Sequence, residues 1–296
     1  MSPKQDPYEK TRIILRFTPI TFVLTKFLHI GANWIAGLFV SVGLLVPFGA
    51  IASGTVLDLR YEVQWGNINV GEAEASWIFT DSTFQMIGSS KTVGISDSLR
   101  KYRGTSEVTG QIYDGIHAPL KIGISGVYKD SAKNATAIWN LEDSQIHTVR
   151  APTLDLEKVH PLDDNFIQGS IDPYTAMLRT LHTIKQTRSC ASRHKVYDGL
   201  RTAELTMHDL GTQVLTGDRA SAYRGKVIKC GLTIKPTGGH RLKSRWNERE
   251  RKADDTVIFV AEIEPGLFLP VRIMIKTMFG KITTRLVMTN LLIRES

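Results

Sequence analysis

The chain has 296 residues, of which 42% are hydrophobic and 22% are charged, and its formal net charge is +8. This composition is typical of a folded protein with a hydrophobic core and excludes a chain that is disordered throughout. The basic excess is spread along the chain rather than gathered in one face or run, so it does not indicate a nucleic-acid-binding protein.

The first part of the chain, residues 1–52, has the organisation of an export signal. Residues 30–57 carry no charge, and residues 35–46 form an apolar stretch of the length found in the hydrophobic region of a signal peptide. Ala50 and Ala52 then supply the small side chains of an A-x-A cleavage site. The sequence therefore predicts an exported protein.

We expect cleavage after Ala52 to leave one β domain, residues 53–296, so that contact with the membrane through the signal is transient. Two alternatives stay open. An uncharged run of this length is almost long enough to span a bilayer, so the signal could persist as an uncleaved inner-membrane anchor. It could also be a buried helix of a folded core. The segment before the apolar stretch is longer than in most signals, which leaves the true translation start open.

Beyond residue 53 the dominant hydrophobic period is two, which is typical of β-strands. Tyr61, Val63 and Trp65 alternate with polar residues, and a Gly-Asn turn follows them. The same alternation recurs in residues 71–79, 120–128, 135–141 and 271–288. Many strands with one apolar and one polar face predict a mainly β protein, built on an antiparallel sheet that curls or closes.

One segment, residues 171–184, has helical rather than strand periodicity. Asp172 is a good N-cap, and Pro173 suits the first helical position. The apolar residues that follow at helical spacing are Tyr174, Met177, Leu178 and Leu181. We expect this one amphipathic helix to lie against the concave face of the curled sheet. The small residues Gly71, Ala73 and Ala75 would leave room there for the helix or for a ligand.

Cys190 and Cys230 are the only cysteines in the chain. In an exported protein an even number of cysteines predicts a disulfide, and two cysteines allow one pairing. A redox-active pair is the alternative, but the two residues lack the C-x-x-C spacing of such sites.

The sequence contains no motif that assigns a catalytic, cofactor-binding or metal-binding residue. Its histidines do not form an H-x-x-x-H or H-E-x-x-H arrangement, and neither a G-x-G-x-x-G nor a P-loop pattern occurs. We therefore expect a non-enzymatic protein without a cofactor. A hydrolase is the alternative, and it would require titratable side chains such as those of His117, His147 and His160 to converge in a cleft.

Several short motifs follow one another in the order found in one protein family. They are the opening YEVQWGNINVGEA, Asp172-Pro173-x-Thr175-Ala176, Cys190, Asp198-Gly199-x-Arg201, Cys230-x5-Pro236-x2-Gly239, Leu269-Pro270-Val271-Arg272 and Thr277-x-x-Gly280. In these motifs the chain resembles a family of exported proteobacterial proteins named domain of unknown function 3108. The resemblance implies a periplasmic protein with a spiral or half-open β-barrel similar to the lipoprotein-carrier fold. The family brings no assigned activity.

The leading hypothesis is a non-enzymatic periplasmic protein that binds an apolar or amphiphilic envelope component, such as a lipid or a lipoprotein-like ligand. A curled sheet with one apolar face and an amphipathic helix is a layout that can enclose a hydrophobic cavity. The predicted cavity residues are Tyr61, Trp65, Trp77 and Trp139 as wall and Met177 as lid. The alternative is a structural or interaction module that supports envelope integrity through contacts with envelope proteins or peptidoglycan.

Overall fold

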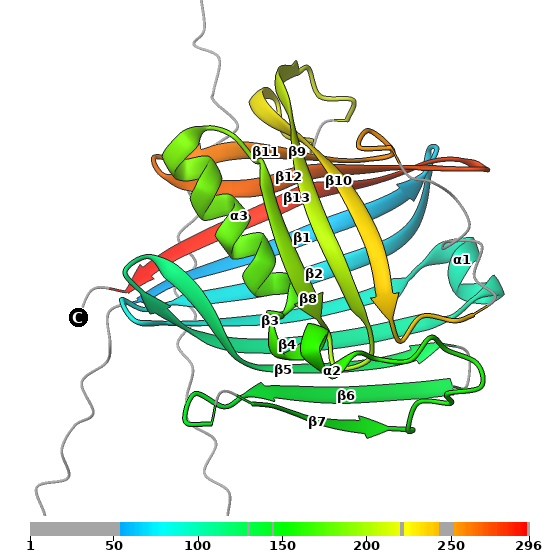
Figure 1. Cartoon of the computed structure of the whole chain (residues 1–296). Helices are drawn as coiled ribbons and strands as arrows, with labels where there is room; N and C mark the ends of the chain where they lie inside the picture. The colour runs from blue at the N-terminus through cyan, green and yellow to red at the C-terminus, as the bar shows by residue number, and fades with distance from the viewer. Residues whose placement is uncertain (1–53, 129–130, 144, 220–221, 243–251, 295–296) are drawn as a thin grey trace, which may run out of the picture. The chain divides into compact units, whose positions relative to one another are not determined.

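The structure, a computed structural model, describes residues 54–128, 131–143, 145–219, 222–242 and 252–294 (Figure 1). The predicted export signal, with Ala50 and Ala52, lies outside the described residues. None of the helices in the described ranges is long and apolar enough to cross a membrane.

The described residues form one sheet of 13 antiparallel strands. The first half of the chain contributes β1 (Gly54–Trp65), β2 (Ile68–Phe79), β3 (Thr83–Thr92), β4 (Tyr102–Tyr113), β5 (Ile116–Tyr128), β6 (Ser131–Trp139) and β7 (Ile146–Ala151). The second half contributes β8 (Ser192–Tyr197), β9 (Thr202–Leu215), β10 (Gly225–Gly238), β11 (Thr256–Glu264), β12 (Leu267–Thr277) and β13 (Gly280–Arg294).

The strand order is β7-β6-β5-β4-β3-β2-β1-β13-β12-β11-β10-β9-β8. The first and last strands in chain order therefore pair with each other, from Gly54 opposite Arg294 to Trp65 opposite Ile282. Strands β7 and β8 are left as the two edges, so the sheet curls without closing (Figure 1). The predicted curled antiparallel sheet, a half-open barrel, is confirmed.

Alternate residues of the first strands form the inner face of the sheet, as the period of two predicts. The buried apolar residues of β1 to β5 are Leu57, Leu59, Trp77, Phe84, Met86, Val108 and Ile122. The turn between β1 and β2 depends on Gly66, whose φ of 58° lies in the left-handed region that favours glycine.

Helix α3 (Pro173–Thr187) lies against the concave side of the sheet and packs against β5, β8 and β12 (Figure 1). Its start is fixed by the buried Asp172 carboxylate, whose Oδ1 accepts hydrogen bonds from the backbone N–H groups of Tyr174 and Thr175 at 2.8 and 2.9 Å. It ends at Arg188, which has a φ of 58°. The predicted amphipathic helix is confirmed, and it extends three residues beyond the predicted end.

One hydrophobic core joins the helix to both halves of the sheet. It includes Leu57, Trp77, Phe84, Leu178, Leu181, Ile184, Phe259 and Leu269. The fully buried Cys190 and Cys230 form a disulfide, with their Cα atoms 5.9 Å apart. This bond ties the segment after α3 to β10 and confirms the predicted pairing.

The open edges of the sheet are held together at one corner by Arg150 of β7. Its Nε donates a hydrogen bond to the carbonyl of Gly199 at 2.6 Å, and its Nη2 donates to the hydroxyl of the buried Tyr197. The Tyr197 hydroxyl in turn lies 3.1 Å from Thr148 Oγ1. Side chains therefore join β7 to β8 where the two strands do not form a ladder.

A second polar cluster fixes the loop between β9 and β10. The carboxylate of Asp218 accepts hydrogen bonds from Arg272 Nη2 at 3.1 Å and from Arg285 Nε at 3.0 Å. Arg285 also donates to the Oε1 of the buried Gln64 at 2.6 Å. This holds the loop against β12, β13 and β1.

Candidate functional site: an exposed apolar rim

Four of the five predicted cavity residues belong to the packed core around α3. Trp77 is buried in it, and Tyr61, Trp139 and Met177 are partly buried against it. The Tyr61 hydroxyl donates to the carbonyl of Pro270 at 3.1 Å, and burial raises the pKa of this hydroxyl. Trp139 Nε1 donates to the carbonyl of Ser170, between the short helix α2 (Asp164–Gln168) and α3, at 2.8 Å. The assignment of the three aromatic residues as cavity wall and of Met177 as lid stays a prediction.

Trp65, the fifth predicted cavity residue, lies at the end of β1 instead. Its side chain is 47% exposed, and its indole Nε1 donates to the carbonyl of Phe279 at 2.8 Å. Phe279 lies in the turn between β12 and β13. The adjacent turn between β1 and β2 is joined to the same place, since the Gly66 N–H donates to the carbonyl of Lys281 at 3.2 Å.

Further exposed apolar side chains lie on these two turns and on helix α1 (Gly94–Leu99), which neighbours the start of β2, and we call the whole set the α1 rim. They are Trp65, Ile68, Ile95, Leu99, Met278 and Phe279, each between 47% and 72% exposed. Ile68 pairs with Trp65 across the β1–β2 turn. Single exposed apolar residues are ordinary on a protein surface, whereas a group of them at one place marks an interaction site.

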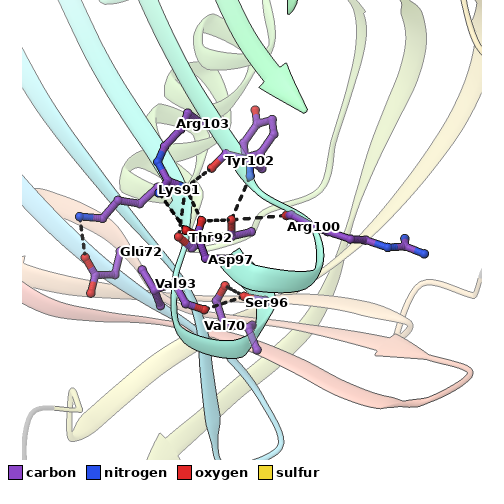
Figure 2. A network of polar contacts seen from close by, with 10 residues as sticks. All are labelled: Val70, Glu72, Lys91, Thr92, Val93, Ser96, Asp97, Arg100, Tyr102 and Arg103. Atoms are coloured by element: carbon purple, nitrogen blue, oxygen red, sulfur yellow. Dashed lines mark hydrogen bonds and ion pairs between the residues drawn. The ribbon is translucent and has the colours of Figure 1, made fainter. Parts of the chain in front are cut away.

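Helix α1 (Gly94–Leu99) brings Ile95 and Leu99 to the rim although it buries none of its own side chains. It follows β3 and lies against the start of β2. The backbone N–H of Val93 donates to the carbonyl of Val70 at 3.2 Å, and Ser96 Oγ donates to the same carbonyl at 2.5 Å (Figure 2).

A network around Asp97 holds α1 in place of apolar packing (Figure 2). Its carboxylate accepts hydrogen bonds from Arg103 Nη1 at 2.5 Å and Nη2 at 3.2 Å, and from Thr92 Oγ1 at 2.8 Å. Thr92 Oγ1 also accepts from the N–H of Tyr102 at 2.9 Å. The hydrogen bonds from Arg103, and then that from Thr92, lower the pKa of Asp97 to about 2. The network therefore joins the residues on both sides of the helix.

We expect Asp97→Asn to increase the hydrogen-exchange rate of the α1 amides severalfold and to leave exchange in the core strands unchanged. The substitution removes the charge that Arg103 contacts. Because the pKa of Asp97 is lowered on folding, the contribution of its carboxylate is present at neutral pH and is lost as the pH falls from about 4 towards about 2. The matched control is Asp143→Asn, an exposed carboxylate before β7. Equal α1 protection in wild type and in Asp97→Asn would contradict the role of the network.

The charges beside the α1 rim are unbalanced. Three basic side chains near it have carboxylate partners: Arg103 pairs with Asp97, Lys91 with Glu72 at 3.2 Å, and Lys276 with Asp254 at 2.5 Å. Three exposed ones, namely Arg100, Lys101 and Lys281, form no ion pair with a carboxylate of the described residues. Figure 2 shows the Arg100 side chain directed away from the network.

A shallow depression over β2 to β5 adjoins the network and shares Arg103 with it, and the ion pair of Lys91 and Glu72 also lines it. Its floor has small residues such as Ser89 and Gly104. The volume is about 260 Å³, which is below the range typical of small-molecule sites. It is an open depression with several polar lining residues rather than an enclosed pocket.

The histidines considered for a hydrolase lie in three different environments. His117 of β5 is half-buried, with its ring 5.5 Å from that of Phe84, whereas His147 and His160 are exposed. His147 lies 3.3 Å from an oxygen of Asp143. In the described part of the chain, no group of three or more His, Cys, Asp or Glu side chains has the arrangement of a metal site.

The rim was missed at the sequence level because Trp65 continues the strand alternation of Tyr61 and Val63. The available signals were the Gly-Asn turn directly after Trp65 and the glycine, Gly280, directly after Phe279, since glycines mark turns and residues beside turns lie at the ends of strands. The six residues of helix α1 show no helical spacing of apolar residues from which the helix could have been predicted.

The comparisons with known proteins identify the family. A family model described as "Protein of unknown function (DUF3108)" matches residues 60–287. A solved structure from Brucella abortus, described as a beta-barrel-like protein of domain of unknown function DUF1849, is similar over 82% of this chain and 99% of that chain, with 8% identity and a TM-score of 0.44. This likeness is too weak to carry an argument about function. No curated protein matches the chain. Because the family model covers more than half of it, the chain belongs to the DUF3108 family of proteins of unknown function.

Proposed function

We propose that this protein is a non-enzymatic protein of the periplasm that binds an amphiphilic envelope component, such as a lipid or the lipid part of a lipoprotein, through the α1 rim. The observation that carries the proposal is that six exposed, large apolar side chains lie on two adjoining turns and a neighbouring helix. Exposure of these apolar side chains to water is unfavourable in free energy. Contact with an apolar partner removes that surface from water.

Two further observations support the proposal. The disulfide between Cys190 and Cys230 is typical of proteins in oxidising compartments, which agrees with export to the periplasm. The concave face is covered by α3, whose Leu178, Leu181 and Ile184 belong to the core. The second feature favours contact at the rim over contact inside the sheet.

The test is binding of the purified protein to phospholipid vesicles, measured by co-sedimentation. In Leu99→Ser/Phe279→Ser two apolar side chains that are each 72% exposed are replaced, so the fold is not expected to change. Burying each of them contributes about 1.5–3 kcal/mol, so we expect the apparent affinity to fall about 100-fold or more.

The matched control is Tyr113→Ser/Ile116→Ser. These residues are also exposed and apolar, but they lie beside the turn between β4 and β5. We expect this variant to bind vesicles like the wild type. Absence of wild-type binding, or equal losses in both variants, would refute the assignment of the rim.

A second candidate function is an interaction module that binds a polar envelope partner, namely a protein or peptidoglycan. The observation that favours it is the depression over β2 to β5, with its small polar residues and paired charges. This candidate predicts that the Leu99→Ser/Phe279→Ser variant keeps all of its partner contacts. Cross-linking of that variant and of the wild type in intact cells distinguishes the two functions.

A further inference from the structure

We infer that the α1 rim docks onto the surface of a bilayer that contains anionic phospholipids, with Arg100, Lys101 and Lys281 contacting the headgroups while the apolar residues enter the interface. The inference rests on the proposed function and specifies its partner.

The first step is the position of the charges. Arg100 and Lys101 directly follow α1 in the chain, and Leu99 of the rim directly precedes them. Lys281 follows the β12–β13 turn that carries Phe279, and its carbonyl accepts the hydrogen bond from Gly66 beside Trp65. Cations therefore flank the apolar group at two separate elements.

The second step is that these charges are free to act on a partner. The nearby carboxylates Asp97, Glu72 and Asp254 are engaged by Arg103, Lys91 and Lys276, and Arg60 also pairs with Glu72. Glu62, opposite Glu72 in the sheet, accepts a hydrogen bond from Gln64 and has no cation partner among the described residues. Within the described ranges, Arg100, Lys101 and Lys281 are exposed and form no close ion pair with a carboxylate, and Lys101 acts on Asp97 only over a longer distance. The rim thus presents a local positive charge, which is complementary to anionic headgroups.

The third step is the match between these residue types and a membrane interface. Trp and other large apolar side chains enter the boundary between headgroups and acyl chains, and Arg and Lys extend their apolar stems beside them while the charge stays at the headgroups. The α1 rim combines both classes on adjacent turns, so one face can make both contacts at once.

A second copy of this chain fits the rim less well. In a two-fold dimer the same patch meets itself, so the three cations of one copy would face the three cations of the other. Such a contact places like charges together without a compensating carboxylate, whereas an anionic lipid surface neutralises them.

The experiment measures binding of the full-length mature protein to vesicles of phosphatidylcholine alone and of phosphatidylcholine mixed with phosphatidylglycerol. We expect the wild type to bind the mixed vesicles much more tightly and to lose this preference as salt is added. In Arg100→Gln/Lys101→Gln/Lys281→Gln the affinity for mixed vesicles should fall on the order of 100-fold, since each Lys or Arg near an anionic surface contributes about fivefold.

The matched control is Arg193→Gln/Lys121→Gln/Lys226→Gln, which removes the same net charge from exposed positions outside the rim. We expect this variant to bind mixed vesicles like the wild type. Equal losses in both triple variants would overturn the inference, because net charge rather than the rim would then decide binding.

The lipid comparison separates the inference from the function on which it rests. Equal wild-type affinity for both kinds of vesicle would overturn the anionic preference and leave the amphiphile-binding function standing. Absence of binding to either kind would overturn both.

Discussion

Replacing both cysteines by alanine is expected to lower the free energy of unfolding by about 4 kcal/mol, because the bond closes a loop between residues separated by 40 positions. A cross-link over such a loop removes many conformations from the unfolded chain. Cys190 and Cys230 are both fully buried, so alanine is preferred to serine, whose hydroxyl would be left in the core. Urea unfolding of wild type and of the double variant gives the difference.

The control is the wild-type protein unfolded with and without a thiol reductant. The reduced wild type should approach the variant, because both lack the cross-link between the segment after α3 and β10. A double variant that unfolds at the same urea concentration as the oxidised wild type would show that the bond does not constrain the unfolded chain.

The stability of the protein is expected to fall as the pH decreases from 6.5 to 4, and His117 is expected to contribute to this fall. Burial, with smaller effects of the positive charges of His182 and Arg179, lowers the pKa of His117 to about 4. Over this range the unfolded chain binds a proton at His117 while the folded protein does not. Protonation therefore favours unfolding as the pH falls.

His117→Gln removes this proton-linked term. Because the ring is only partly buried, we expect the variant to lose about 2 kcal/mol less than the wild type between pH 6.5 and pH 4. The matched control is His147→Gln, the same substitution at an exposed histidine. Urea unfolding across this pH range provides the measurement. Parallel profiles of His117→Gln and wild type would contradict a buried neutral imidazole.

The elements with strong local signals were predictable from the sequence. The alternation around Tyr61 and Trp77 gave strands, and Asp172-Pro173 followed by apolar residues at helical spacing gave α3. The disulfide followed from having two cysteines in a chain with a predicted export signal. In each case the prediction depends on a few neighbouring residues or on the number of cysteines. It does not depend on knowing which distant residues are in contact.

The arrangement of these elements and the candidate site were not predictable in the same way. The alternation of apolar and polar residues identifies β1 and β13 as strands. It does not indicate that these two distant strands pair with each other. The position of helix α1 depends on the hydrogen bonds that Arg103, on the following strand β4, donates to Asp97. Trp65 alternates like a core residue, and its exposure depends on the turn that ends its strand.

The pairing of β1 with β13 also means that the sheet can be completed only after the last strand has been synthesised. The first strand to leave the ribosome has no partner on one side until the thirteenth has been made, so the sheet has a high contact order and cannot be completed one part at a time. A chain that stops before Gly280 leaves the edges of β1 and β12 open in the middle of the sheet, where they can pair with other molecules. Truncated chains should therefore aggregate rather than fold into a smaller barrel.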